Sequence, residues 1–107
     1  MEVLTPTELA AWLADASRPR PLLLDVREPW EFDRCRIDGA INVPMQTIPE
    51  RMQELDEAAP IVAICHHGMR SYQVASYLER AGFETLYNLS GGVAAWADQV
   101  DPAMPRY

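Results

Sequence analysis

The chain contains short, mostly apolar runs that are separated by stretches in which apolar residues recur with helical spacing. The runs lie at residues 22–26, 41–43, 61–64 and 85–89. A short apolar run is typical of a strand in a parallel sheet, where both faces of the strand are covered. The pattern therefore predicts four strands that belong to one parallel sheet.

Five stretches around these runs predict helices. The first begins at Thr5, where Pro6 and Glu8 complete a capping box, and it ends before the prolines near residue 20. The others are expected at residues 29–34, 49–57, 71–81 and 93–100, with Gly82 ending the fourth helix. Residues 101–107 contain two prolines, and we expect an irregular tail there.

Strands that alternate with helices at this spacing imply an α/β fold. We expect one domain over residues 1–107, with a central parallel sheet of about five strands and helices on both faces. Such sheets bind ligands at the carboxyl ends of their strands. Asp25 and Cys65 each lie at such an end, so both are expected near the functional site.

Composition and charge narrow the classes of function. The net charge is −7, which argues against a nucleic-acid surface. All nine basic residues are arginine. No apolar run approaches the ~20 residues of a membrane span, and residues 1–4 do not begin a secretory signal, so we expect no membrane contact and a cytoplasmic location. Two cysteines make no disulfide framework. In a reducing compartment they are expected to be free, and one is a candidate catalytic thiol.

The segment with the strongest candidate chemistry joins a predicted strand to a predicted helix. It reads Cys65-His66-His67-Gly68-Met69-Arg70-Ser71. A thiol at this point lies beside loop amides and a helix N-terminus, and both stabilise negative charge. Arg70 adds a fixed positive charge. We therefore predict that Cys65 is a nucleophile for anionic sulfur or phosphorus compounds.

Four segments resemble, in order, the motifs of the rhodanese family of single-domain sulfurtransferases. They are Asp25-Val26-Arg27-Glu28 with Glu31-Phe32, residues 37–44, the Cys65 loop with four residues between cysteine and arginine, and residues 89–96. The resemblance runs from about residue 4 to residue 96 and implies a single rhodanese-like domain. The chain departs from the family pattern at Cys35-Arg36, where Gly-His is usual.

The resemblance implies sulfur transfer through a covalent intermediate. Cys65 would take the outer sulfur of a small anionic donor such as thiosulfate, become a persulfide, and pass the sulfur to cyanide or a thiol. The amides that would cradle the donor or the persulfide belong to His66, His67, Gly68, Met69, Arg70 and Ser71. Neither a metal nor a cofactor is required. The alternative is a sulfur carrier or a regulatory module of the same family, which acts on a partner protein that donates or accepts sulfur.

Loop length bears on the choice between sulfur and phosphate chemistry. Related dual-specificity phosphatases have one more residue between the cysteine and the arginine, which fits a tetrahedral phosphate. The four residues in this chain enclose a smaller ring, which suits a single sulfur atom. We therefore expect the site to prefer sulfane sulfur over phosphate esters.

Several loop residues have structural as well as functional interpretations. The adjacent His66 and His67 are expected to point in different directions and to shape the pocket mouth, with a titratable charge near neutral pH, rather than to bind zinc. Gly68 is expected to supply a backbone conformation that other residues resist. Arg70 either anchors the loop or polarises the site. Residues 91–92 are expected to make a tight connection from strand to helix.

Three charged residues outside the loop are predicted to support it. Arg27 is expected to pair with Glu31, and Asp25 is expected to help position the loop. Cys35 is most simply a small buried residue, since cysteine is often buried and behaves as a small hydrophobe. The alternative is a relay thiol that lies close to Cys65.

Overall fold

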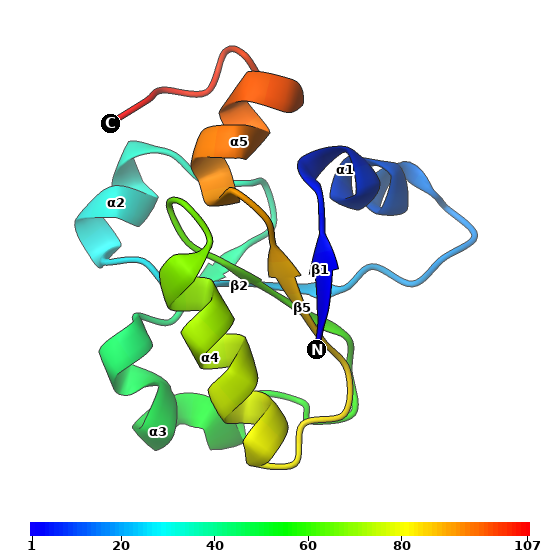
Figure 1. Cartoon of the computed structure of the whole chain (residues 1–107), viewed down its shortest axis with the longest axis vertical. Coiled ribbons are helices and arrows are strands. Elements are labelled where there is room, and N and C mark those ends of the chain that lie inside the picture. Colours follow the sequence, from blue (N-terminus) through cyan, green and yellow to red (C-terminus); the bar gives the residue numbers. More distant parts are fainter.

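Five parallel strands form the central sheet in a computed structural model that describes residues 1–107. They are β1 (Glu2–Leu4), β2 (Leu22–Asp25), β3 (Ile41–Asn42), β4 (Ile61–Ile64) and β5 (Leu86–Leu89). Their order across the sheet is β1-β5-β4-β2-β3, so β4 lies at the centre. All four residues of β4 are buried, because helices cover both faces of the sheet (Figure 1).

The helices pack in two layers, one on each face of the sheet (Figure 1). They are α1 (Pro6–Ala14), α2 (Pro29–Arg34), α3 (Ile48–Arg51), α4 (Met69–Arg80) and α5 (Gly92–Gln99). Val62 and Ile64 of β4 pack in the layer that contains residues of α1 and α5. Ile61 and Ala63 pack in the layer that contains residues of α3 and α4. This division follows from the strand geometry, because successive side chains point to opposite faces.

The predicted fold class is confirmed, with one strand that the apolar pattern omitted. β1 lies at the edge of the sheet and pairs with β5, with Glu2 opposite Tyr87 and Leu4 opposite Leu89. Three residues with a charged first member carry too little apolar pattern to indicate a strand, and the pairing with β5 decides the conformation. None of the helices is both long and apolar enough to cross a membrane.

The helices predicted over residues 49–57 and 71–81 differ most from their predicted bounds. The single helix predicted over residues 49–57 is a series of short turns, in which 3₁₀ turns at Met45–Thr47 and Met52–Glu54 flank α3. An apolar stripe this short packs against the core in either geometry, so it does not fix the helix type. α4 begins at Met69 because Gly68 caps it. At the other end Gly82 follows the C-cap with φ of +103°, a left-handed ending of the predicted kind.

The topology brings the carboxyl ends of three neighbouring strands together on one side of the sheet. Cys65 follows β4, Asp25 ends β2, and Asn88 lies near the end of β5. Because β4 pairs with both β2 and β5, the loop after β4 is flanked on both sides by the ends of neighbouring strands. The Cys65 loop therefore lies at the carboxyl ends of the strands, the position at which a ligand was expected to bind.

Candidate active site

The sulfur of Cys65 lies inside the loop between β4 and α4. It accepts hydrogen bonds from the backbone N–H of Gly68 at 3.1 Å and from the hydroxyl of Ser71 at 3.3 Å. The residue is only 1% exposed, so these two donors are its immediate polar surroundings. Both contacts place partial positive charge beside the sulfur.

Gly68 shapes the loop through its backbone. Its φ of +102° is a conformation that residues with a Cβ rarely adopt, and an added Cβ would lie 3.2 Å from the nitrogen of Gly91. The predicted special conformation of Gly68 is confirmed. Gly68 is also the N-cap of α4. The N–H groups in the first turn of that helix have no acceptor within the helix, and they lie where the Cys65 loop ends. The side chain of Met69 is exposed to solvent.

A polar connection runs from Ser71 into β5. The Ser71 hydroxyl lies 2.5 Å from the amide oxygen of Asn88, and the amide nitrogen of Asn88 donates to the carbonyl oxygen of Gly68 at 3.1 Å. Ser71 has one hydroxyl proton, so it donates either to Asn88 or to Cys65 at a given moment. Asn88 is not among the site residues predicted from the sequence. The available signal was an amide side chain in an otherwise largely apolar strand.

Arg70 is held by Glu31, which lies 39 residues away in the sequence. The two form a two-point ion pair, with Nη1 2.7 Å from Oε1 and Nη2 2.9 Å from Oε2. The Arg70 hydrogen bonds lower the pKa of the Glu31 carboxyl to about 2, against the opposing effect of burial. The same contact raises the pKa of Arg70. Of the two roles considered for Arg70, this geometry is that of an anchor between the loop and α2.

The predicted ion pair between Arg27 and Glu31 is wrong. Arg27 is fully buried and pairs with Asp25, with Nη2 2.7 Å from Oδ2 and Nε 2.9 Å from Oδ1. Its remaining contacts to α2 reach the carbonyl oxygens of Glu31 (3.2 Å) and Cys35 (2.6 Å). Burial lowers the pKa of Arg27, but its hydrogen bonds to Asp25 and Tyr107 outweigh burial and leave that pKa raised.

Two physical reasons explain this correction. The carboxylate of Glu31, in the first turn of α2, accepts the N–H of Glu28 at 2.9 Å, which turns it towards the helix start and Arg70 rather than towards Arg27. The carboxylate of Asp25 is committed to Arg27, and its side chain makes no hydrogen bond to the Cys65 loop. Asp25 therefore supports α2 through Arg27 rather than the loop directly.

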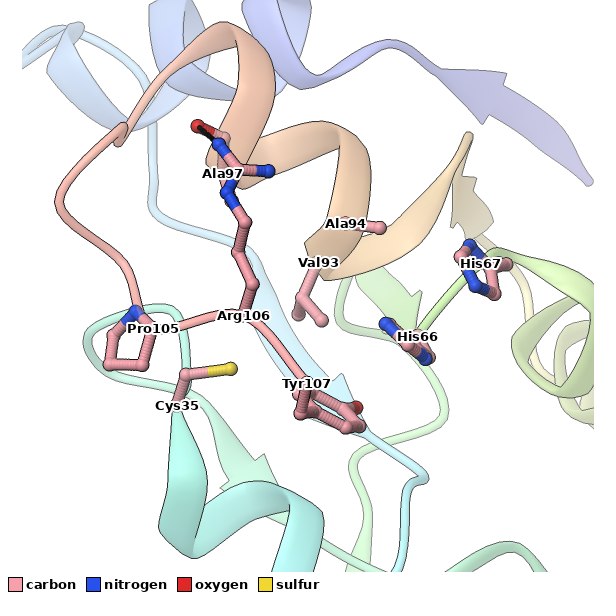
Figure 2. A pocket seen from close by; sticks show the side chains of 9 residues that line it. All are labelled: Cys35, His66, His67, Val93, Ala94, Ala97, Pro105, Arg106 and Tyr107. Atoms are coloured by element: carbon pink, nitrogen blue, oxygen red, sulfur yellow. Dashed lines mark hydrogen bonds between the residues drawn. The ribbon is translucent and has the colours of Figure 1, made fainter.

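His66 and His67 stack on each other, contrary to the expectation that they point in different directions. Their ring centroids lie 4.0 Å apart with planes 26° apart. Tyr107 stacks on the other face of His66, with centroids 4.1 Å apart and planes 15° apart (Figure 2). Burial, and next the neighbouring His67, lower the pKa of His66 below its usual 6.5. This direction of the pKa shift disfavours the positive charge that was expected on His66 near neutral pH.

The tail over residues 101–107 contains no helix or strand, as predicted, but it is docked onto the domain. Figure 1 shows it running from the end of α5 towards α2. Met104 is buried in the core layer of α1 and α5. The hydroxyl of Tyr107 donates to Glu31 Oε2 at 2.9 Å and accepts from Arg27 Nη1 at 2.8 Å. Burial raises the pKa of Tyr107 to about 12, so the phenol keeps the proton that it donates.

The N-terminus of α5 packs directly against the Cys65 loop. The N–H of Val93 donates to the carbonyl oxygen of Cys65 at 2.9 Å, and that of Ala94 donates to the carbonyl oxygen of His66 at 3.1 Å. A Cβ on Gly92 would lie 2.3 Å from the oxygen of Cys65. The predicted tight connection at residues 91–92 is confirmed, and its reason is this close approach of two backbones.

A cavity of about 200 Å³ lies beside the loop, between α5, the end of α2 and the tail. Figure 2 shows the sulfur of Cys35 and the rings of His66 and Tyr107 around it. Cys35 and Cys65 are both free thiols. They belong to different core layers, since Cys35 packs with residues of α1 and α5, and Cys65 with residues of α3 and α4. The interpretation of Cys35 as a small buried residue fits this position.

Comparison with known proteins identifies relatives along nearly the whole chain. A family model described as Rhodanese-like domain matches residues 5–99. The chain is 39% identical over 106 residues to a probable adenylyltransferase/sulfurtransferase MoeZ of Mycobacterium tuberculosis, and the match covers 97% of this chain but only 26% of that protein. It is 33% identical over 78 residues to the thiosulfate sulfurtransferase GlpE of Tolumonas auensis, covering 73% of this chain and 74% of that protein.

A solved structure gives the same fold. The protein SSP1007 of Staphylococcus saprophyticus superposes with a TM-score of 0.85 at 34% sequence identity. The match covers 94% of this chain and 97% of that chain. The agreement in fold therefore extends over nearly the whole of both chains.

Proposed function

Because the chain belongs to the rhodanese-like domain family, we propose that it is a sulfurtransferase that carries the transferred sulfur as a persulfide on Cys65. The observation that carries this proposal is the position of the Cys65 sulfur, which lies within reach of the Gly68 N–H and the Ser71 hydroxyl. Hydrogen-bond donors around a buried sulfur stabilise the charge that develops there during attack and departure. Residues 1–107 would act as one unit in this reaction.

In the first half-reaction the Cys65 thiolate attacks the outer sulfur of thiosulfate. A new S–S bond forms to Cys65, the S–S bond of thiosulfate breaks, and sulfite leaves with the electron pair of that bond. The N–H groups of the loop and of the first turn of α4 receive the negative charge of the donor. The name of the relative GlpE, thiosulfate sulfurtransferase, supports thiosulfate as a donor.

In the second half-reaction an acceptor nucleophile removes the outer sulfur. Cyanide or a thiolate attacks that sulfur, the persulfide S–S bond breaks, and Cys65 leaves as the thiolate that began the cycle. No electrons enter or leave the overall reaction, so the chain's own residues suffice for it. A reducing compartment such as the cytoplasm would keep both thiols free for this chemistry.

A second candidate is a sulfur carrier that works with a partner protein. The MoeZ relative is named both an adenylyltransferase and a sulfurtransferase, and this chain covers only 26% of its length. A domain of this kind would receive or deliver sulfur at the same Cys65, with a protein as donor or acceptor. The two candidates share the persulfide and differ in what exchanges sulfur with it.

Intact-mass measurement after mixing with thiosulfate tests the proposal. We expect the mass of one additional sulfur atom on the wild-type chain, located by peptide mapping to Cys65, and its loss on addition of cyanide. Cys65→Ala should fold normally by circular dichroism and gain no sulfur. An aryl phosphate serves as the competing substrate, and its hydrolysis at a rate above that of sulfur transfer would favour phosphatase chemistry instead. Retained sulfur transfer by folded Cys65→Ala would refute the assignment.

A further inference from the structure

Tyr107 is linked to both ends of the Cys65 loop. It contacts the first end directly, and it is connected to the second through the carboxylate of Glu31. Its ring stacks on His66 at the start of the loop (Figure 2). Its hydroxyl donates to Glu31 Oε2 at 2.9 Å, and the same carboxylate holds Arg70 at the end of the loop. One side chain of the tail therefore restrains the loop from two sides.

Other contacts fix the position of Tyr107. Met104 is buried in the core, and Arg106 pairs with Asp98 of α5. The hydroxyl of Tyr107 also accepts from Arg27 Nη1 at 2.8 Å. Arg27 is fully buried and is itself held by two hydrogen bonds from Nε and Nη2 to Asp25. The phenol is thus bound to groups that have little freedom to move.

We infer that Tyr107 is a positioning residue for sulfur transfer, which holds the Cys65 loop in the shape that receives the sulfur donor. The inference rests on the proposed function. The family match covers residues 5–99 and so does not reach this contact. Tyr107 acts through His66 and Glu31, and its hydroxyl makes no hydrogen bond to the Cys65 sulfur.

The physical reason is the narrow range of a useful hydrogen bond. The anionic atoms of the sulfur donor must lie about 2.7–3.2 Å from the N–H groups of the loop to accept hydrogen bonds from them. A displacement of the loop by ~1 Å can therefore cost much of a rate enhancement that depends on alignment. The His66 stack and the Glu31 carboxylate limit such displacement at both ends. Tyr107 should therefore affect the rate of persulfide formation more than the affinity for the donor.

Two variants of the full chain separate the ring from the hydroxyl. Tyr107→Phe keeps the ring that stacks on His66 and removes both hydrogen bonds, whereas Tyr107→Ala removes ring and hydroxyl. Tyr77→Phe, at a partly exposed position on α4, is the matched control. For each variant we would measure kcat and KM for thiosulfate in turnover with cyanide as the acceptor, the rate of persulfide formation in a single turnover, amide hydrogen exchange over residues 66–71, and thermal unfolding.

We expect kcat to fall about three- to tenfold in Tyr107→Phe, the range expected for losing hydrogen bonds of ordinary strength. It should fall further in Tyr107→Ala, with a smaller change in KM and faster exchange of the loop amides in both variants. Tyr77→Phe should match the wild type. If the wild type forms no persulfide, the proposed function fails while loop exchange still tests the role of Tyr107. Normal kcat and normal loop exchange in Tyr107→Ala would overturn the inference, and so would a loss of activity that only matches the fraction of unfolded protein.

Discussion

The guanidinium of Arg70 and the carboxylate of Glu31 form a two-point ion pair, with two N–O distances of 2.7 and 2.9 Å. The pair joins the first turn of α4 to the first turn of α2. The Glu31 side chain is 5% exposed and that of Arg70 is 36% exposed, so solvent weakens the interaction only partly. This contact fixes the end of the Cys65 loop against a neighbouring element.

Replacing Glu31 by glutamine should therefore destabilise the protein and slow persulfide formation. The amide side chain would keep the shape but lose the charge that Arg70 requires, and we expect a loss of about 2 kcal/mol in the free energy of unfolding. Glu54→Gln is the matched control, because Glu54 pairs with Arg51 at an exposed position and such pairs contribute roughly 0–1 kcal/mol. Urea unfolding of both variants checks this. Equal losses in the two would contradict the role of the buried pair.

The contribution of Glu31 to stability should depend on pH. Its pKa is about 2 in the folded protein, against an ordinary 4.5. A lowered folded-state pKa means that the stabilisation is fully present above about pH 4.5 and is lost as the pH falls towards about 2. The difference in unfolding free energy between wild type and Glu31→Gln should shrink over that window. Denaturation series at several pH values measure it, and a constant difference would argue against the pair as its source.

Gly92→Ala should disrupt the site, and Gly82→Ala offers a matched comparison. Both glycines have positive φ, +60° and +103°. A Cβ on Gly92 would meet the backbone oxygen of Cys65 at 2.3 Å, whereas nothing lies within 4 Å of a Cβ on Gly82. We expect a loss of about 3 kcal/mol or more for Gly92→Ala, and about 1 kcal/mol of backbone strain alone for Gly82→Ala. Thermal unfolding of both variants measures these losses of stability. Equal losses would mean that the Cys65 loop and α5 separate easily to accommodate the added Cβ.

The imidazole of His66 should titrate below its usual range, and the ring of Tyr107 should be a main reason. Burial is the largest cause of the lowered pKa, and the Tyr107 ring covers one face of His66 at 4.1 Å. Tyr107→Ala should therefore move the pKa of His66 up towards 6.5, whereas Tyr107→Phe should leave it low. NMR titration of the two histidines measures this. An unchanged value in the alanine variant would show that other groups desolvate the ring.

Cys35→Ala should leave the first half-reaction intact. Cys35 packs in the core layer of α1 and α5, and its thiol makes one long contact, 3.8 Å from Arg27 Nη1. We expect normal sulfur loading of Cys65 from thiosulfate and a modest loss of stability of about 1 kcal/mol, since a small buried group is removed. Intact mass and peptide mapping follow the loading. Loss of persulfide formation in the folded variant would instead favour Cys35 as a relay thiol.

Much of this architecture follows from local sequence patterns. Short, mostly apolar runs set β2, β4 and β5, because buried strands need apolar residues on both faces. Thr5 caps α1 with Glu8 as predicted. The Cys65 loop and its special glycine, Gly68, were also readable, because a strand end, a short loop and a helix start are consecutive in the chain. The Cys65 loop lies at the carboxyl ends of the strands, as predicted, because it directly follows β4 in the chain.

Partner choice among distant side chains was decided by the tertiary structure alone. The sequence-based prediction paired Arg27 with Glu31, four residues further on. In the fold the buried guanidinium of Arg27 pairs with Asp25, only two residues away, and Glu31 pairs with Arg70, 39 residues away. Asn88 enters the site because β5 lies beside β4, and Tyr107 enters because the tail folds back over α2. A charged or hydrogen-bonding side chain pairs with whatever the packed core brings within about 3 Å, and that distance depends on the whole chain rather than on any stretch of it.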